Sequence, residues 1–221
     1  MAVPTKGNVT FNNSTPGANF RNQAHTQNTG SDGLIVAQFT MANSTGYASA
    51  TYGGVAMNVL YGINRAGLGQ RMAFFYLENP PTGNNTLRVN FNANQWNPLS
   101  TCIMSFTNSG GVGNSLRTGG SATPHNATLT VSDDSLIMIT SCSINAITAQ
   151  QIPTGTNQTY VQHNTNRQVA TGAISSNAGH SAGSISLRAT ATFGSLSLDR
   201  TEILGISAPV ETGNADFFAL L

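Results

Sequence analysis

The hydrophobic and polar positions of this chain fall into short runs separated by turn residues, a pattern that predicts β-strands and leaves little room for helix. Residues 86–91 alternate strictly, so we expect a half-buried strand with Leu87, Val89 and Phe91 facing the interior. Two further β-prone runs, residues 48–52 and 55–61, flank a glycine pair that can adopt positive φ angles. This arrangement predicts a tight hairpin.

Several longer apolar runs predict buried strands, namely residues 34–41, 72–77, 101–106 and 136–140. Residues 8–11 predict a first edge strand, and the segments that follow or separate the strands predict loops, namely the Asn-rich stretch up to residue 30 and residues 62–69, 92–98 and 110–120. We therefore predict an all-β protein, an antiparallel β-sandwich with roughly a dozen short strands, in a single domain over residues 1–221.

Part of this pattern recurs about a hundred residues further along the chain. The turn and strand that begin at Asp32 are echoed at Asp134, and Leu87-Arg88-Val89 is echoed by Leu187-Arg188-Ala189. An isoleucine follows at the same spacing in both halves. These matches predict pseudo-repeated halves at about residues 31–110 and 129–208. Alternating strands of unrelated origin would look similar, so both interpretations stay open at this point.

The composition supports strands and gives no sign of a charged partner. Only 8% of the residues are charged, against about 25% in typical soluble domains, and Asn, Thr, Ser, Gln and Gly replace them. The formal net charge of +1 and the scattered basic residues predict no binding to nucleic acid or to an anionic membrane. Arg88 and Arg188, on predicted strands, are expected to be exposed on a strand face, with pairing to a neighbouring acid as the alternative.

The sequence predicts no enzyme, no cofactor and no bound metal. No nucleotide-binding loop and no Gly-x-Ser-x-Gly elbow occurs. The four histidines lie among polar residues, which predicts surface positions, and none has zinc-site spacing; they are His25, His125, His163 and His180. Asp199 and Glu202 form the closest acid pair near a strand, but their spacing places them on opposite faces. A polysaccharide-cleaving site built on this pair is therefore the least favoured hypothesis.

The two cysteines, Cys102 and Cys142, lie in apolar strand-like runs. We expect buried free thiols, with an inter-strand disulfide as the alternative if the two strands are adjacent. The N-terminal residues lack the apolar core of a secretory signal, and no segment approaches the length of a membrane span. We therefore expect synthesis in a host cytoplasm without export.

Two groups of residues are candidates for contact with partners. Trp96 and Tyr47 lie on predicted connections, where their rings could stack on a glycan or receptor. Residues 215–221 form an apolar tail that must pack on its own core or on a neighbouring subunit. The predicted subunit contacts in this tail are Phe217, Phe218, Leu220 and Leu221.

Three segments together resemble a jelly-roll, lectin-like module found in structural proteins of tailed bacteriophages and in bacterial surface proteins. They are Ser31-Asp32-Gly33-Leu34-Ile35-Val36, Thr51-Tyr52-Gly53-Gly54-Val55-Ala56-Met57 and Tyr76-Leu77-Glu78-Asn79-Pro80-Pro81-Thr82-Gly83-Asn84-Asn85-Thr86-Leu87-Arg88-Val89. The resemblance covers much of the chain and is looser in the later half. It implies a β-sandwich with a non-enzymatic adhesive or structural role, and it brings no catalytic residue. The missing export signal favours the bacteriophage branch.

On these grounds the expected function is that of a virion structural protein that decorates and stabilises a capsid. Its expected partners are other virion proteins of the capsid or tail and further copies of itself, so a homo-oligomer located in the virion is predicted. The alternative is a receptor-binding module of a tail or head fibre, which would hold a host surface glycan against Trp96 and Tyr47.

Overall fold

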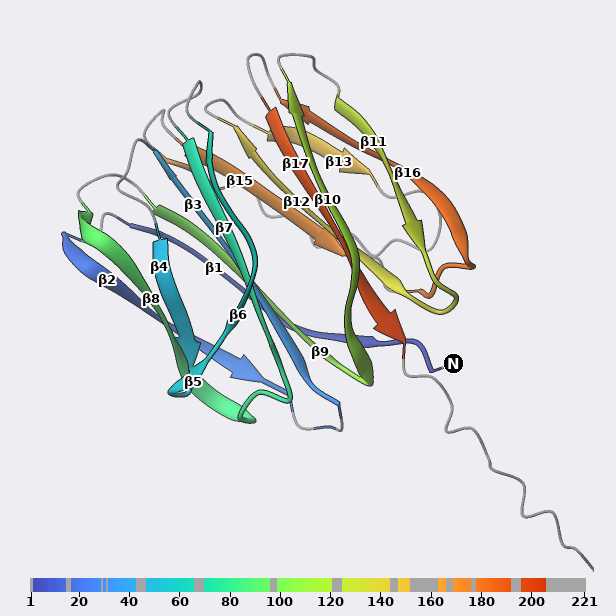
Figure 1. The fold of residues 1–221 in the computed structure, drawn as a ribbon, viewed down its shortest axis with the longest axis horizontal. Helices are drawn as coiled ribbons and strands as arrows, with labels where there is room; N and C mark the ends of the chain where they lie inside the picture. Colours follow the sequence, from blue (N-terminus) through green and yellow to red (C-terminus); the bar gives the residue numbers. More distant parts are fainter. Residues whose placement is uncertain are drawn as a thin grey trace, which may run out of the picture.

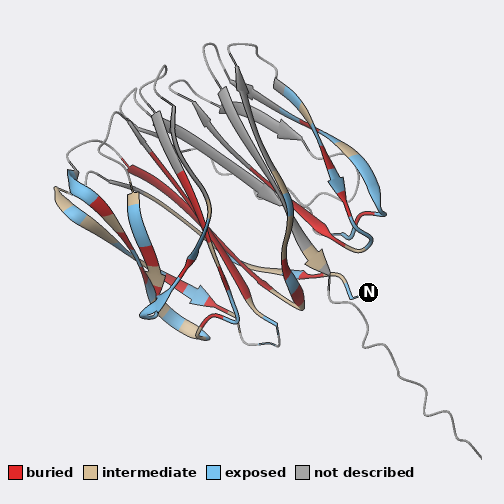
Figure 2. Ribbon diagram, in the orientation of Figure 1, coloured by how far each residue is buried: buried red, intermediate tan, exposed pale blue. Residues whose placement is uncertain are grey.

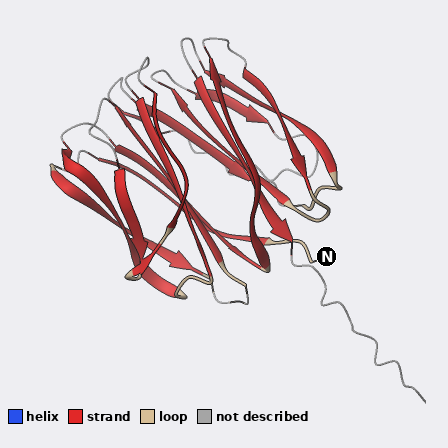
Figure 3. Ribbon diagram, in the orientation of Figure 1, coloured by secondary structure: helices blue, strands red, loops and turns tan. Residues whose placement is uncertain are grey.

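The computed structural model describes most of the chain, in ranges that exclude the C-terminal residues. The described residues are 2–14, 17–28, 30, 32–42, 47–65, 70–95, 99–120, 125–143, 147–151, 163–165, 169–175, 178–191 and 196–205. Within these ranges every regular element is a β-strand (Figure 3), and the paired strands of the described residues run antiparallel. The predicted all-β sandwich class is confirmed.

The strands divide into two consecutive groups along the chain. The first group is β1 (Thr5–Ser14), β2 (Ala18–Gln27), β3 (Leu34–Ala42), β4 (Tyr47–Tyr52), β5 (Val55–Ala56), β6 (Asn58–Arg65), β7 (Gln70–Glu78), β8 (Gly83–Gln95) and β9 (Leu99–Thr107). The second group is β10 (Ser109–Gly120), β11 (His125–Val131), β12 (Leu136–Ser143), β13 (Ile147–Gln151), β14 (His163–Thr165), β15 (Val169–Ser175), β16 (Gly183–Ala191) and β17 (Leu196–Gly205).

Both groups follow the same connection plan. The first large sheet has the order β1-β9-β3-β7-β6, and the second large sheet has the order β10-β17-β12-β15-β14. The first small sheet has the order β2-β8-β4-β5, and the second small sheet has the order β11-β16-β13. In the large sheet of each group, the last strand of the group lies between the first and the third strands. In the small sheet of each group, the second strand lies beside the penultimate strand. This is the connectivity of a jelly roll, and it occurs twice, in a unit that begins at β1 and again at β10.

The four sheets form four layers, with the two large sheets in the middle (Figure 1). The large sheets pack against each other through the inter-sheet core, a cluster of buried side chains from both halves. Its members are Leu34, Val36, Phe74, Cys102, Met104, Phe106, Leu136 and Met138. Since the first large sheet also packs on its own small sheet, β3 and β9 are buried on both faces (Figure 2). Consecutive residues of these strands are therefore buried, including the polar residues Gln38, Thr40, Ser100, Thr101 and Ser105.

Within the first half, a second cluster fills the space between the large and the small sheet. Leu87, Val89 and Phe91 of β8 point into it, as the alternation of residues 86–91 predicts. They meet the odd-numbered residues of β3, such as Ile35 and Phe39, whose even-numbered neighbours face the inter-sheet core. Each residue of β3 from Leu34 to Thr40 is consequently buried.

The predicted hairpin is confirmed, with Tyr52 paired to Val55 across Gly53-Gly54. The φ angles of the two glycines are 55° and 85°, which places both in the left-handed region that a type I′ turn requires. A Cβ at Gly54 would have nothing within 4 Å, so only the backbone conformation opposes a side chain there. We expect Gly54→Ala to lower the free energy of unfolding by about 1 kcal/mol, measured by urea denaturation.

The matched control for the hairpin is Gly54→Asn, because asparagine tolerates the left-handed region better than alanine does. We expect Gly54→Asn to lose less stability than Gly54→Ala. Equal losses for the two variants would show that the left-handed conformation of Gly54 does not set the cost.

Four predicted loops are wrong in whole or in part. The Asn-rich stretch before residue 30 contains β2, residues 110–120 belong to β10, β6 extends to Arg65, and β8 extends to Gln95. β2 is polar on both of its faces and β10 is rich in glycine, so neither carries the apolar period on which strand prediction depends. With seventeen strands in the described residues, the estimate of a dozen is too low.

The turns that lead into the third strand of each group have matching geometry. Asp32 and Asp134, which precede β3 and β12, have φ angles of 50° and 59°. In the first half the amide N of Asn79 donates to the carbonyl O of Gly33, and in the second half the amide N of His180 donates to the carbonyl O of Ser135. The turn positions predicted for these aspartates are correct.

Candidate functional site

The first small sheet presents a flat, neutral face to the outside of the molecule. Residues of even number on β2 and β8 point outward, because their odd-numbered neighbours face the interior. The described residues of this outer face are Phe20, Asn22, Ala24, Thr26, Ser49, Thr51, Asn84, Thr86, Arg88, Asn90 and Asn92. Among them Arg88 is the only charged side chain.

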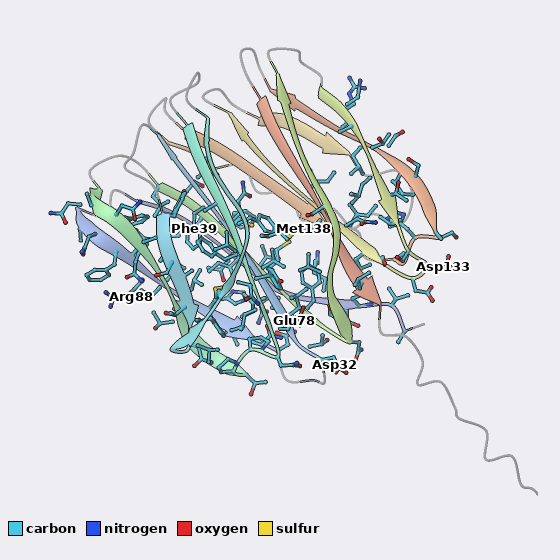
Figure 4. All side chains as sticks on the ribbon, viewed as in Figure 1. Asp32, Phe39, Glu78, Arg88, Asp133 and Met138 are labelled. Carbon is cyan, nitrogen blue, oxygen red and sulfur yellow. The ribbon has the colours of Figure 1, made fainter. Side chains whose placement is uncertain are left out.

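Contacts that link the strands β2, β8 and β4 hold the Arg88 side chain in place. Its guanidinium carbon Cζ lies 4.2 Å from the centroid of the Phe20 ring on β2, within cation–π distance. Its Nε donates to Oδ1 of Asn90 at 2.9 Å, and Nδ2 of Asn90 donates to Oγ of Ser49 on β4 at 3.0 Å. No acidic side chain of the described residues pairs with it. The predicted exposed position of Arg88 is confirmed (Figure 4).

The second small sheet carries an arginine at the corresponding register position. Arg88 lies between Asn22 of β2 and Thr51 of β4 in the backbone pairing. Arg188 of β16 lies between Asn126 of β11 and Gln151 of β13. Both arginines are exposed. Since the two small sheets are the outermost layers, the molecule has one such arginine on each of its opposite faces (Figure 1).

The inner face of β2 is polar and largely buried, and it carries His25. The exposed fraction of His25 is 2%, its Nδ1 lies 2.8 Å from Oγ1 of Thr10, and its ring makes an edge contact with Tyr52. Its Nε2 has no hydrogen-bond partner among the described residues. Burial in this low-dielectric setting lowers the pKa of His25 to about 4. The predicted surface position of this histidine is wrong, because β2 was not recognised as a strand with an inner face.

Tyr52 links this region to the loop before β8. Its hydroxyl donates to the carbonyl O of His25 at 2.9 Å and lies 3.3 Å from the carbonyl O of Gly83. The ring is fully buried in the core of the first half. The tyrosine of the Thr51-Tyr52-Gly53-Gly54 segment therefore has a structural role, in that it ties β2 to the end of the loop at residues 79–82.

His180 is the second histidine whose predicted surface position is wrong. Only 5% of its surface is exposed, because its backbone pairs with Ser135 in an isolated bridge and seats the residue against β12. Burial lowers the pKa of His180. Residues 179–185 line a surface hollow of about 520 Å³, and the amide N of Ala182 donates to Oδ1 of Asp133 beside it. The side chains of His125 and His163 lie outside the described residues.

The predicted glycan-contact residues have different outcomes. Tyr47 begins β4 and is partly buried, with its ring centroid 5.9 Å from Phe39, 6.5 Å from Phe75 and 5.9 Å from Phe91. These contacts place one side of the ring on the core of the first half. Trp96 lies outside the described residues, as do the predicted subunit contacts Phe217, Phe218, Leu220 and Leu221. The glycan role of Trp96 and Tyr47 and the subunit role of the tail stay predictions.

Cys102 is a free, fully buried thiol in the inter-sheet core. Burial among apolar side chains raises its pKa well above the usual value, so the thiol is neutral and unreactive in the folded protein. The predicted free thiol is confirmed for Cys102, and the alternative disulfide with Cys142 is not formed. The side chain of Cys142 lies outside the described residues.

The described residues contain no group of three or more His, Cys, Asp and Glu side chains that could hold a metal ion. The strand β17 carries Asp199 and Glu202, whose side chains are not described. In the described part of the chain no helix has the length and apolar character needed to cross a membrane.

Comparison with known proteins assigns no family. No protein-family model matches the chain, and no curated protein shows significant sequence similarity to it.

The exposed position of Arg88 can be predicted from the sequence, but the residue that holds Arg88 in place cannot. Phe20 lies in the stretch that was predicted to be a loop, so nothing placed its ring beside β8. The sizes of the side chains in this strand carry a signal. The inward residues Arg21, Gln23, His25 and Gln27 are larger on average than the outward residues Phe20, Asn22, Ala24 and Thr26. Hydropathy alone cannot detect this pattern, because both sets are mainly polar.

Proposed function

We propose that this protein is a non-enzymatic structural component of a bacteriophage virion that decorates and stabilises the capsid through self-association and contact with the shell. The observation that supports the proposal best is the stack of two jelly rolls joined through the inter-sheet core. Jelly rolls are common in viral capsid and lectin domains. The resemblance of three sequence segments to a module of tailed-bacteriophage structural proteins points the same way.

The physical properties of the described residues suit a subunit in a dense array. The central strands β3 and β9 are buried on both faces, so the body of the protein is thick and resists deformation. The formal net charge is only +1, and copies that sit close together on a shell therefore repel one another little. Contacts made by neutral Asn, Thr and Ser side chains also vary less with salt than contacts made by ion pairs.

The experiment compares purified particles made with and without this protein. We expect mass spectrometry to find the chain in the particles, with the same whole number of copies for each symmetry-equivalent position of the capsid. We also expect particles that lack it to release their genome at a lower temperature, since a decoration protein adds contacts between shell subunits. Absence of the chain from purified particles, or its presence only in isolated tails, would exclude this function.

A further inference from the structure

The outer face of the first small sheet holds a guanidinium group whose position is fixed before any ligand arrives. An exposed arginine normally loses side-chain entropy when it binds, at a cost of up to about 2 kcal/mol. Phe20 and Asn90 already restrict Arg88 from two sides. Part of this loss of side-chain entropy has therefore already occurred in the free protein, so Arg88 is preorganised for binding.

We propose that this face binds an acidic sugar, with the guanidinium of Arg88 holding the sugar carboxylate. The contact from Nε to Asn90 leaves the two terminal amino groups of the guanidinium as donors, and the Arg88 side chain is exposed. Two parallel N–H groups of an arginine match the two oxygens of a carboxylate. The contact with Phe20, 4.2 Å from Cζ to the ring centroid, restricts where the guanidinium can lie.

The surroundings of Arg88 match the rest of a sugar ring. Asn22 and Thr51 are its register neighbours on β2 and β4, and Asn90 and Ser49 complete the hydrogen-bonded row. Amide and hydroxyl groups of this kind both donate and accept hydrogen bonds, as sugar hydroxyls do. A neutral face with one cation therefore fits a ligand that has one carboxylate and several hydroxyls in each repeating unit.

The charge pattern of this face argues against nucleic acids and polyphosphates as its ligands. Nucleic acids and polyphosphates gain most of their affinity from several lysines and arginines along one surface. The described residues of this face supply one positive charge. An acidic peptide segment would meet the same single charge and also carries backbone hydrogen-bonding groups, so polyglutamate is the competitor that the experiment below compares with the sugar.

Arg188 extends the proposal to the opposite face of the molecule. Its register neighbour on β11 is Asn126, as the register neighbour of Arg88 on β2 is Asn22. A polysaccharide with many carboxylates, or two such chains, can therefore engage both faces, and avidity would raise an affinity that is weak at one site. This inference holds whether or not the protein is a component of a capsid.

The test measures binding of polygalacturonate to the intact protein by calorimetry and uses its methyl ester as the matched ligand. The ester replaces each charged carboxylate of the polymer by an uncharged methyl ester. We expect polygalacturonate to bind at low salt and the methyl ester to bind at least tenfold more weakly, since a charge-assisted contact is lost. Failure of polygalacturonate to bind would overturn the proposal.

Four variants locate the site. Arg88→Gln is expected to weaken binding about tenfold, and Arg88→Lys, which keeps the charge but loses the planar fork, is expected to weaken it by a similar factor. Phe20→Leu removes the π face and is expected to weaken binding about threefold. Arg188→Gln is expected to lower the number of sites on the protein and, because avidity is lost, the apparent affinity for the polymer. Thermal unfolding of each variant shows whether it remains folded.

Two further ligands separate this proposal from its competitors. Polyglutamate that binds as tightly as polygalacturonate would show that any polycarboxylate suffices, and inorganic polyphosphate that binds more tightly would show a general anion site. Either result would overturn the assignment to an acidic sugar. Full affinity in Arg88→Lys would also overturn it, because charge alone would then explain binding.

Discussion

Replacing Phe106 by alanine is expected to lower the free energy of unfolding by about 3 to 5 kcal/mol. The Phe106 side chain is fully buried in the inter-sheet core, where it belongs to the same cluster as Leu136 and Met138 of the second half. Removing the ring loses its buried apolar area and leaves a cavity between two sheets that cannot close without moving both jelly rolls. Urea denaturation followed by circular dichroism measures the change.

The control for Phe106→Ala is Val59→Ala on β6, where 57% of the side-chain surface is exposed. We expect that variant to remain within about 0.5 kcal/mol of the original protein. If the large sheets were not packed together, Phe106→Ala would behave like Val59→Ala. A loss below about 1 kcal/mol for Phe106→Ala would therefore contradict the stacked arrangement of the two halves.

Acidification from pH 7 to pH 4 is expected to destabilise the protein through His25. The pKa of His25 is lowered to about 4 in the folded state, against about 6.5 in the unfolded chain. Between these values the unfolded chain binds a proton that the folded protein does not, so stability falls as the pH falls through this window. The full effect below the folded pKa is about 3 kcal/mol. Burial of His180 acts in the same direction.

The variant His25→Asn separates this contribution from that of the carboxylates. An asparagine amide can keep a hydrogen bond to Thr10, but it does not titrate. Its stability at pH 7 will differ, so the quantity to compare is the change in unfolding free energy between pH 7 and pH 4. We expect that change to be smaller in His25→Asn than in the original protein. An unchanged pH dependence would show that His25 is not buried in a neutral form.

The parts of the fold that could be predicted are those where one face of a strand is apolar and the other polar. The alternation of β8 predicted its inward residues, and Gly53-Gly54 predicted the hairpin, because each depends on local chemistry alone. The runs that became β3 and β9 were predicted as buried, but only the packing of two large sheets explains why both of their faces are buried. No local pattern in the sequence carries that information.

The parts that could not be predicted depend on strands with polar interiors. The inner face of β2 carries Arg21, Gln23, His25 and Gln27, so the strand has no apolar period and was missed. Because β2 is missing from the prediction, His25 is predicted to lie on the surface and the contact between Phe20 and Arg88 is not predicted. The pseudo-repeat was visible in short matches around Asp32 and Arg88, whereas the strands that begin each unit, β1 and β10, lack such matches.

A cryo-electron-microscopy reconstruction of the intact particle is the most direct measurement of the central proposal, that this protein is a structural component on the capsid. We expect symmetric copies of a body with four β-layers on the outside of the shell, with the two large sheets in the middle of each copy. A well-resolved shell without such density would contradict it.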